Sequence, residues 1–243
     1  MTTQTDCERR YAGKITLVTG SRRGVGKFIA EHFLQHGATV IGFARGAASI
    51  EHPAYHHFEV DVGNPDSVLK GFAGIRQITD VIHIVINNAA VLTSQYAMIM
   101  PPAAAQAMIN INLLGPFMVS REAAKMMRRS KWGRIINIGS MAASLEPVGD
   151  SIYAACKAGV STLANVMAKE FASMNVTCNT LGINAIDSDM LSQLPREKIE
   201  AIIAGLPVPR FSQPDDILNV IDFFAAERSA AITAQTVFLG GVN

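Results

Sequence analysis

The stretch KITLVTGSRRGVGKFIAEHFLQHG, residues 14–37, decides the fold of this chain. An apolar run typical of a strand leads into a loop with Gly20, Gly24 and Gly26, and a helical pattern follows. Glycines let the backbone turn tightly and approach a phosphate group, while a helix N-terminus offers free N–H groups and the positive end of its dipole. The stretch therefore predicts a strand, a phosphate-binding turn and a helix, with a merely structural turn as the alternative.

Similar apolar runs recur along the chain, each followed by a helix-like segment. They are KITLV, ATVIGFAR, HHFEVDV, DVIHIVINNAA, GRIINIGS, NVTCNTLGI and TVFLGG. Runs rich in Val and Ile that are apolar throughout are typical of strands buried on both faces of a parallel sheet. The alternation of strands and helices predicts an α/β fold, namely a single-domain, doubly wound parallel sheet with helices on both faces.

Length and composition support one large domain. The chain has 243 residues, of which 49% are hydrophobic, and a formal net charge of +1. This composition excludes low-complexity disorder, and the near-neutral charge gives no general attraction to nucleic acid or to anionic membranes. Without a linker or a repeat, we expect one domain over residues 11–243 after a flexible tail over residues 1–10.

Cysteine usage and the N-terminus favour a cytoplasmic protein. Cys7, Cys156 and Cys178 form no CxxC motif and no even framework, so we interpret them as reduced thiols. The polar N-terminus lacks the apolar core of a signal peptide. His52, His56 and His57 have no metal-ligand spacing, so no metal is expected.

An uncharged stretch covers residues 81–120, but Asn and Pro residues interrupt it. A membrane span of ~20 apolar residues is therefore missing. We expect a buried strand, a loop and then a helix that is covered by protein, for which another subunit is one candidate.

The end of the second strand indicates which dinucleotide is preferred. An acidic residue there would grip the ribose hydroxyls and repel a 2′-phosphate, but this chain has Phe43-Ala44-Arg45. Arg22 and Arg23 in the preceding loop would add guanidinium groups near the same point. Converging guanidinium groups favour NADP(H) over NAD(H), and solvated surface arginines are the alternative.

Six motifs occur in the order typical of one family: TGSRRGVG, Asp61-Val62, NNAA at 87–90, Asn112, Ser140 and YAACK at 153–157. The chain thereby resembles the short-chain dehydrogenase/reductase family along nearly its whole length, which implies a Rossmann-like fold. The resemblance implies four catalytic residues, Asn112, Ser140, Tyr153 and Lys157. It also implies a cofactor site made of Gly20, Ser21, Arg22, Arg23, Gly24, Val25, Gly26, Arg45, Asp61, Val62, Asn88, Ala89, Ala90, Tyr153, Lys157, Ile186 and Ser188.

The chemistry of these residues suits the reduction of a carbonyl group. Tyr153 and Lys157 stand four apart, so on a helix they share one face, although simple packing would have the same spacing. Ser140 can polarise the carbonyl oxygen and Tyr153 can protonate it, and we expect the Lys157 cation to bring the phenol pKa down from ~10. The resemblance further implies that Lys157 reaches the nicotinamide ribose and that Asn112 holds a water molecule for proton resupply.

Three departures from the family pattern stand near the end of the chain. Ile183-Asn184 replaces Pro-Gly, Ser188 replaces Thr, and Ala234 stands where Gly is usual. Losing Pro-Gly leaves the path of the loop over the nicotinamide open, because Pro rigidifies and Gly permits positive φ. All four catalytic positions are filled, so we expect catalysis to be retained.

Within the family, AAKMMRRSKWGRIINIGS and two other blocks resemble 3-oxoacyl-[acyl-carrier-protein] reductases. Arg128, Arg129 and Lys131 form a basic cluster suited to an acidic carrier protein, although cations at a helix C-terminus also complement its dipole. A second basic position of that group is Met174 here, which favours a specialised pathway for a carrier-bound or coenzyme A-bound chain.

The sequence thus predicts NADPH-dependent reduction of a 3-oxoacyl thioester to the 3-hydroxyacyl form. One alternative is a reductase or dehydrogenase of another small alcohol, sugar or cyclic diol. The other is a catalytically weak, cofactor-binding partner subunit. The resemblance also implies a homotetramer or dimer, with the helix after Pro102 and the helix carrying Tyr153 packing across one interface.

Overall fold

A computed structural model describes residues 9–186 and 196–242 and contains one parallel sheet of seven strands. The strands are β1 (Ile15–Thr19), β2 (Thr39–Ala44), β3 (Tyr55–Glu59), β4 (Ile84–Asn87), β5 (Gly133–Ser140), β6 (Val176–Ile183) and β7 (Thr236–Phe238). Their order in the sheet is β3-β2-β1-β4-β5-β6-β7. The order reverses between β1 and β4, and ligands of doubly wound sheets bind beside such a reversal.

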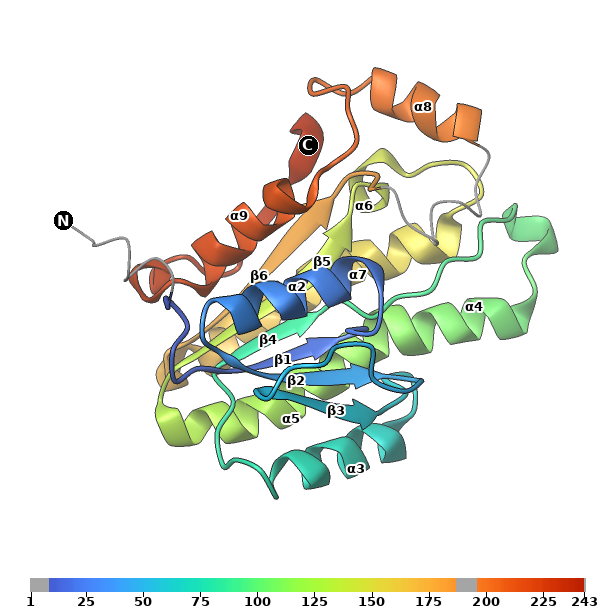
Figure 1. Cartoon of the computed structure of the whole chain (residues 1–243). Coiled ribbons are helices and arrows are strands. Elements are labelled where there is room, and N and C mark those ends of the chain that lie inside the picture. Colours follow the sequence, from blue (N-terminus) through green and yellow to red (C-terminus); the bar gives the residue numbers. More distant parts are fainter. Residues whose placement is uncertain (1–8, 187–195, 243) are drawn as a thin grey trace.

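Helices cover both faces of the sheet (Figure 1). They are α2 (Gly24–Gln35), α3 (Pro65–Ile75), α4 (Pro102–Ile109), α5 (Gly115–Ser130), α6 (Ala142–Leu145), α7 (Ser151–Phe171), α8 (Arg196–Ala204) and α9 (Pro214–Ala225). Short turns of helix are η1 (Ala97–Ile99), η2 (Asn110–Leu114), η3 (Ala172–Met174), η5 (Glu227–Ser229) and η6 (Leu239–Gly241). Helices α2 and α9 pack on one face and α3, α5 and α7 on the other, while α8 lies apart from the sheet.

The two-sided core follows from the alternation of side chains along each strand. Leu17 and Val18 are adjacent in β1 and both fully buried, yet Leu17 packs toward α3 and α5, whereas Val18 packs toward α2 and α9. A strand buried on both faces needs apolar residues at successive positions, which is the pattern of the predicted runs. The predicted doubly wound α/β fold is therefore confirmed.

The tail over residues 1–10 stays a prediction, although its last residue contacts the domain. Arg10 forms an ion pair of 2.5 Å with Asp222 of α9, and the Tyr11 hydroxyl donates to the same carboxylate at 2.6 Å. Arg10, the last residue of the expected tail, is thus attached to the domain by Asp222 of α9. The sequence of the first ten residues does not predict this contact, because Asp222 is more than 200 residues away.

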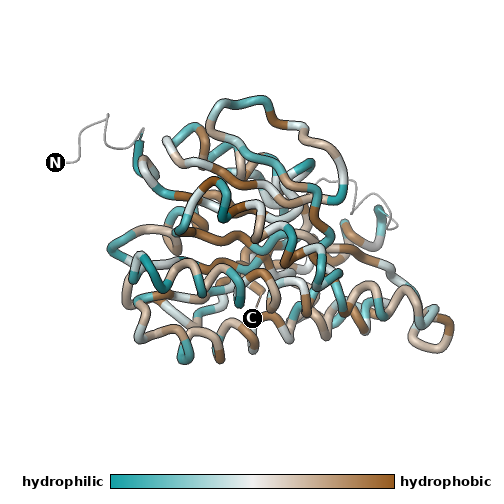
Figure 2. The backbone as a smooth tube through the Cα atoms, turned by 90° about the horizontal axis from the view of Figure 1, so that it is seen from below, coloured by the Kyte–Doolittle hydropathy of each residue, from teal (hydrophilic) through white to brown (hydrophobic). Residues whose placement is uncertain are grey.

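The uncharged stretch becomes β4, η1, α4, η2 and the first half of α5. Half of the residues of α4 are exposed within one chain, as are Leu114 and Phe117 beside it and Val166 on α7. Figure 2 also shows an apolar turn around η1 that projects from one end of the molecule, where Met98 is fully exposed. In the described part of the chain, no helix has the length and apolarity to cross a membrane.

Candidate active site

A cavity of about 680 Å³ lies at the C-terminal edge of the sheet, between the loops that follow successive strands. Most of the predicted site residues line it: Gly20, Arg22, Arg23, Gly24, Val25, Arg45, Asp61, Val62, Asn88, Ala89, Ala90, Ser140, Tyr153, Lys157 and Ile186. Ser21, Gly26 and Asn112 lie behind its wall, and Ser188 lies outside the described residues.

The turn between β1 and α2 has the geometry that a phosphate needs. Gly20 and Gly24 have φ angles of 70° and 54°, which side chains disfavour. A Cβ on Gly26 would stand 2.2 Å from the Gly20 carbonyl oxygen, so only glycine allows the helix to approach the turn this closely. No side chain caps the N-terminus of α2, which leaves first-turn N–H groups for an anion. These features fit a dinucleotide pyrophosphate.

Thr19, which the sequence analysis missed, joins this turn to the NNAA motif. Its hydroxyl oxygen accepts from the backbone N–H groups of Asn88 and Ala89 at 2.9 and 3.0 Å. The Asn88 side chain donates in return to the Thr19 carbonyl at 3.0 Å. Thr19 is buried at the end of β1, so both walls of the cofactor pocket are fixed to one hydroxyl group.

Ser21 faces the sheet rather than the cavity, contrary to the cofactor contact expected for it. Its hydroxyl is 2.9 Å from the Tyr55 hydroxyl, which is 3.1 Å from His57 Nδ1. His57 Nε2 lies 2.8 Å from the Gly46 carbonyl, so this nitrogen donates. The chain of polar groups links the phosphate turn to the loop after β2 and positions that loop.

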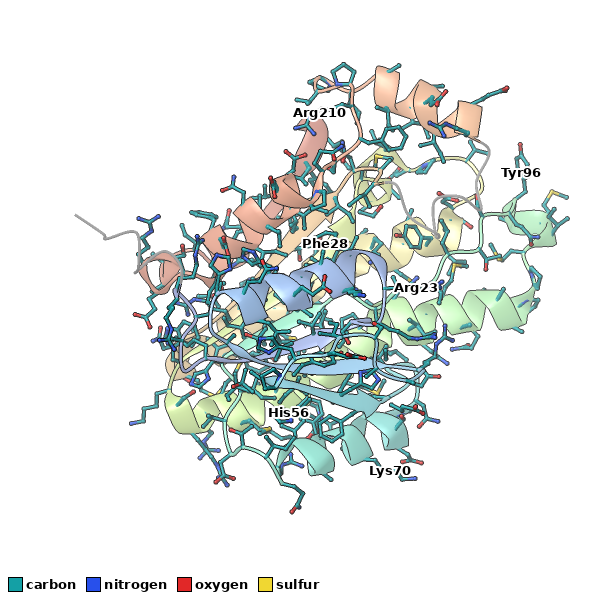
Figure 3. The ribbon with its side chains drawn as sticks, viewed as in Figure 1. Arg23, Phe28, His56, Lys70, Tyr96 and Arg210 are labelled. Carbon is teal, nitrogen blue, oxygen red and sulfur yellow. The ribbon has the colours of Figure 1, made fainter. Side chains whose placement is uncertain are left out.

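The same loop shapes the adenosine end of the cavity. Arg22 and Arg45 are exposed, and a Cβ on Gly46 would stand 3.1 Å from an Arg22 guanidinium nitrogen. Figure 3 shows Arg23 at this edge of the sheet, on the side of the molecule toward which Tyr96 projects. Ala44, at the end of β2, lines the cavity without a carboxylate. The position predicted to receive a 2′-phosphate is therefore bordered by guanidinium groups.

Ser140, Tyr153 and Lys157 converge at the other end of the cavity. Ser140 ends β5, and its hydroxyl group lines the cavity together with the Tyr153 hydroxyl. The Lys157 ammonium donates to the Ile138 carbonyl at 2.7 Å and lies 5.7 Å from the centre of the Tyr153 ring. Tyr153 and Lys157 are both buried, so their predicted shared helix face is turned into the protein.

The expected depression of the phenol pKa is wrong for this structure. Burial raises the pKa of Tyr153 to about 12, against a lowering effect of the neighbouring Ser140 hydroxyl. Burial also lowers the pKa of Lys157 to about 8. Desolvation disfavours the charged form of each group and is the largest cause of both pKa shifts, an effect that residue spacing does not reveal.

Asn112 has a different contact from the one expected. Its side-chain nitrogen donates to the Val91 carbonyl at 2.8 Å, and its oxygen accepts from the Val91 N–H at 2.9 Å. The residue lies in the wide turn η2, between α4 and α5. Its side chain therefore fixes the loop after β4, and the structure does not bring it into the cavity.

Asn184, which stands where the family pattern has Gly, connects two segments of the chain through its side chain. Its side chain donates to the Arg210 carbonyl at 3.1 Å and accepts from the Ser212 hydroxyl. Asn184 has no positive φ, so losing Gly causes no backbone strain there, whereas Ala234 has a φ of 57°. The amide links the end of β6 to the segment that precedes α9.

The substrate side of the cavity is mostly apolar. Its lining includes Leu92, Met141, Leu145, Ile183, Ile199 and Ile202. Asp150, at the start of α7, also lines the cavity and was missed by the sequence analysis.

The basic cluster at the end of α5 is remote from this cavity within one chain. Arg129 pairs with Asp80 at 2.9 Å, and both side chains are exposed. Lys131 directly precedes β5, while Ser140 at the far end of β5 lies in the cavity. An eight-residue strand separates the two sites by about 23 Å.

Comparison with known proteins agrees with this geometry. A family model described as short chain dehydrogenase matches residues 14–199. The 3-oxoacyl-[acyl-carrier-protein] reductase FabG of Aquifex aeolicus is 32% identical over 244 residues, covering 96% of this chain and 98% of the relative. FabG of Vibrio cholerae is 35% identical over 235 residues, covering 94% and 96%. The ligand-free aldohexose dehydrogenase of Thermoplasma acidophilum has a TM-score of 0.87 and 26% identity, covering 96% and 95%.

Proposed function

Because this chain belongs to the short-chain dehydrogenase family, whose members use nicotinamide cofactors, we propose that it reduces the ketone of a 3-oxoacyl thioester with NADPH. One observation carries the proposal: a single cavity joins Arg22 and Arg45 at one end to Ser140 and Tyr153 at the other. A dinucleotide laid along it would place its adenosine phosphate against the guanidinium groups and its nicotinamide near the phenol.

The side chains at the nicotinamide end have complementary roles. NADPH, when bound, supplies the hydride that the carbonyl carbon receives. The Ser140 hydroxyl donates to the carbonyl oxygen, and the Tyr153 hydroxyl transfers its proton to that oxygen as negative charge develops there. The Lys157 ammonium stabilises the phenolate that remains until a proton from solvent restores the phenol. The products are the 3-hydroxyacyl thioester and NADP⁺.

The apolar substrate side and the FabG relatives support an acyl chain as substrate. A sugar or small diol is the second candidate, favoured by the similarity to aldohexose dehydrogenase and by the Asp150 carboxylate in the cavity wall. Ser140, Tyr153 and Lys157 lining one cavity argue against a catalytically weak partner subunit, because the groups that the reaction needs are all present there.

A carrier protein docked at Arg128, Arg129 and Lys131 would face away from the cavity of the same chain. We therefore propose that docking there serves the cavity of another copy in a homotetramer or dimer. The exposed apolar side chains of Leu114 in η2, Phe117 in α5 and Val166 in α7 support packing of the helical segment after Pro102 and of α7 against such a copy.

A substrate panel tests the proposed function. The purified protein is given NADPH with acetoacetyl thioesters of acyl carrier protein and of coenzyme A, with simple ketones and with aldohexoses plus NADP⁺. We expect kcat/KM to be highest for a thioester. A preference for the sugar would replace the proposal with the second candidate, and carrier-bound rates unaffected by Arg129→Ala would exclude the docking site.

A further inference from the structure

Asp150 carries a carboxylate that the fold itself does not use. Its side chain lies in the wall of the active-site cavity, and only 7% of the residue is exposed. The Oδ1 atom is buried and has no hydrogen-bond partner among the described residues. Buried carboxylates are normally paired, because leaving one without a donor is costly.

The usual structural role of this residue does not apply. Asp150 occupies the N-cap position of α7, where an aspartate commonly accepts from the first-turn N–H groups. Here no side-chain capping bond forms. No cluster of His, Cys, Asp and Glu suited to a metal ion occurs in the described ranges either. Among the described residues, the carboxylate thus has neither a capping hydrogen bond nor a cluster of metal ligands around it.

The backbone holds Asp150 in place beside the reacting groups. Its N–H donates to the Pro147 carbonyl at 3.1 Å, and its carbonyl accepts from the Ala154 N–H at 2.7 Å. The preceding Gly149 carbonyl accepts from the Gln95 N–H at 2.8 Å. Asp150 and Tyr153 are three residues apart at the start of a helix, so their side chains are neighbours on one face.

From these observations we propose that Asp150 accepts a hydrogen bond from an O–H or N–H group of the substrate. This inference rests on the proposed reduction of a ketone at Tyr153. Two sources share the required chemistry. One is a hydroxyl group on a carbon next to the ketone, and the other is the amide N–H of a pantetheine-type thioester arm.

Two substrate pairs separate these sources. Acetoin and butanone differ in one hydroxyl group. The N-acetylcysteamine thioester of acetoacetate carries an amide N–H that its S-butyl thioester lacks. Each pair is measured with NADPH in the wild type, in Asp150→Asn, which keeps the shape, and in Asp150→Ala. Asp215→Asn, an exposed change at the start of α9, is the control.

The wild type is expected to prefer the donor-bearing member of one pair by about 10-fold to 100-fold in kcat/KM, mainly through KM. Asp150→Ala reduces that ratio to about one, Asp150→Asn gives an intermediate ratio, and the control leaves it unchanged. The NADPH dissociation constant stays constant throughout. A ratio near one in the wild type for both pairs, or a ratio that Asp150→Ala does not move, overturns the inference.

The failure of the proposed function has a different signature. If the ketone pair is reduced with an Asp150-dependent ratio but neither thioester is a substrate, the acyl assignment fails and the role of Asp150 stands. If both thioesters are reduced at rates that substitution of Asp150 does not change, the acyl assignment stands and the proposed role of Asp150 fails.

Discussion

The ammonium nitrogen of Lys157 lies 5.7 Å from the centre of the Tyr153 ring. Both side chains are buried on one face of α7, and the Lys157 ammonium donates a hydrogen bond to the Ile138 carbonyl. Burial brings the pKa of Lys157 down to about 8 and raises that of Tyr153 to about 12. The phenol therefore stays protonated over the working range, and the charge of its neighbour is the property that pH changes.

This relationship predicts how reduction depends on pH. Lys157 is charged below about pH 8 and neutral above it. Since the cation stabilises the phenolate that forms during proton transfer, we expect kcat/KM for ketone reduction to fall about tenfold per pH unit above that value. The measurement is a pH profile with NADPH affinity followed in parallel. A profile that stays flat to pH 10 would exclude Lys157 as the controlling group.

Arg22 and Arg45 are predicted to select the cofactor. Each guanidinium group would bond a 2′-phosphate, and a hydrogen bond between charged groups is worth ~10-fold to 100-fold in affinity. Arg22→Ala and Arg45→Ala should weaken NADPH binding by that factor and leave NADH binding nearly constant. Fluorescence titration measures both, with the exposed Arg228→Ala as control. Equal losses of affinity for NADPH and NADH would show that the arginines do not contact the 2′-phosphate.

Thr19 is predicted to act through one hydroxyl group. Thr19→Val leaves the N–H groups of Asn88 and Ala89 without their acceptor, which should lower the free energy of unfolding by ~1–3 kcal/mol and raise KM for NADPH. Thr19→Ser keeps the acceptor and should restore most of both quantities. Urea unfolding and cofactor kinetics provide the check. If Thr19→Val and Thr19→Ser have the same free energy of unfolding and the same KM for NADPH, the hydroxyl group does not link the glycine-rich turn to the NNAA motif.

Ala234 offers a change in stability without a change in activity. Its φ of 57° is unfavourable for a residue with a Cβ, so Ala234→Gly should raise the free energy of unfolding by ~1 kcal/mol. Ala103→Gly, at an exposed position in α4, should instead lower the free energy of unfolding by up to ~1 kcal/mol. Urea unfolding distinguishes the two signs, and a loss of stability at both positions would contradict the strain at Ala234.

The strands could be predicted because their signal is local. A run such as GRIINIGS, residues 133–140, is apolar at successive positions since both faces of β5 are covered, and its bounds match the observed strand. The glycine-rich turn could be predicted for a similar reason. Its prediction requires only the conformational freedom of glycine and the helical pattern that follows.

The missed and misassigned residues depend on contacts between distant segments. Thr19 meets Asn88 about 70 positions away, and Asn184 meets Ser212 across α8, so no spacing rule reveals either pair. The pKa of Tyr153 depends on burial by the whole fold rather than on the lysine one turn away. Asp150 has the sequence of an ordinary helix cap, and only the structure shows that it caps nothing.

One measurement tests the central proposal most directly: the rate at which the full chain consumes NADPH in the presence of an acetoacetyl thioester, with the 3-hydroxyacyl product identified. The wild type should form this product at least tenfold faster with NADPH than with NADH. Tyr153→Phe should abolish product formation while NADPH binding remains, because only the acidic hydroxyl is lost, and the exposed Tyr96→Phe should retain full activity. Unchanged turnover in Tyr153→Phe, or equal rates with the two cofactors, would contradict it.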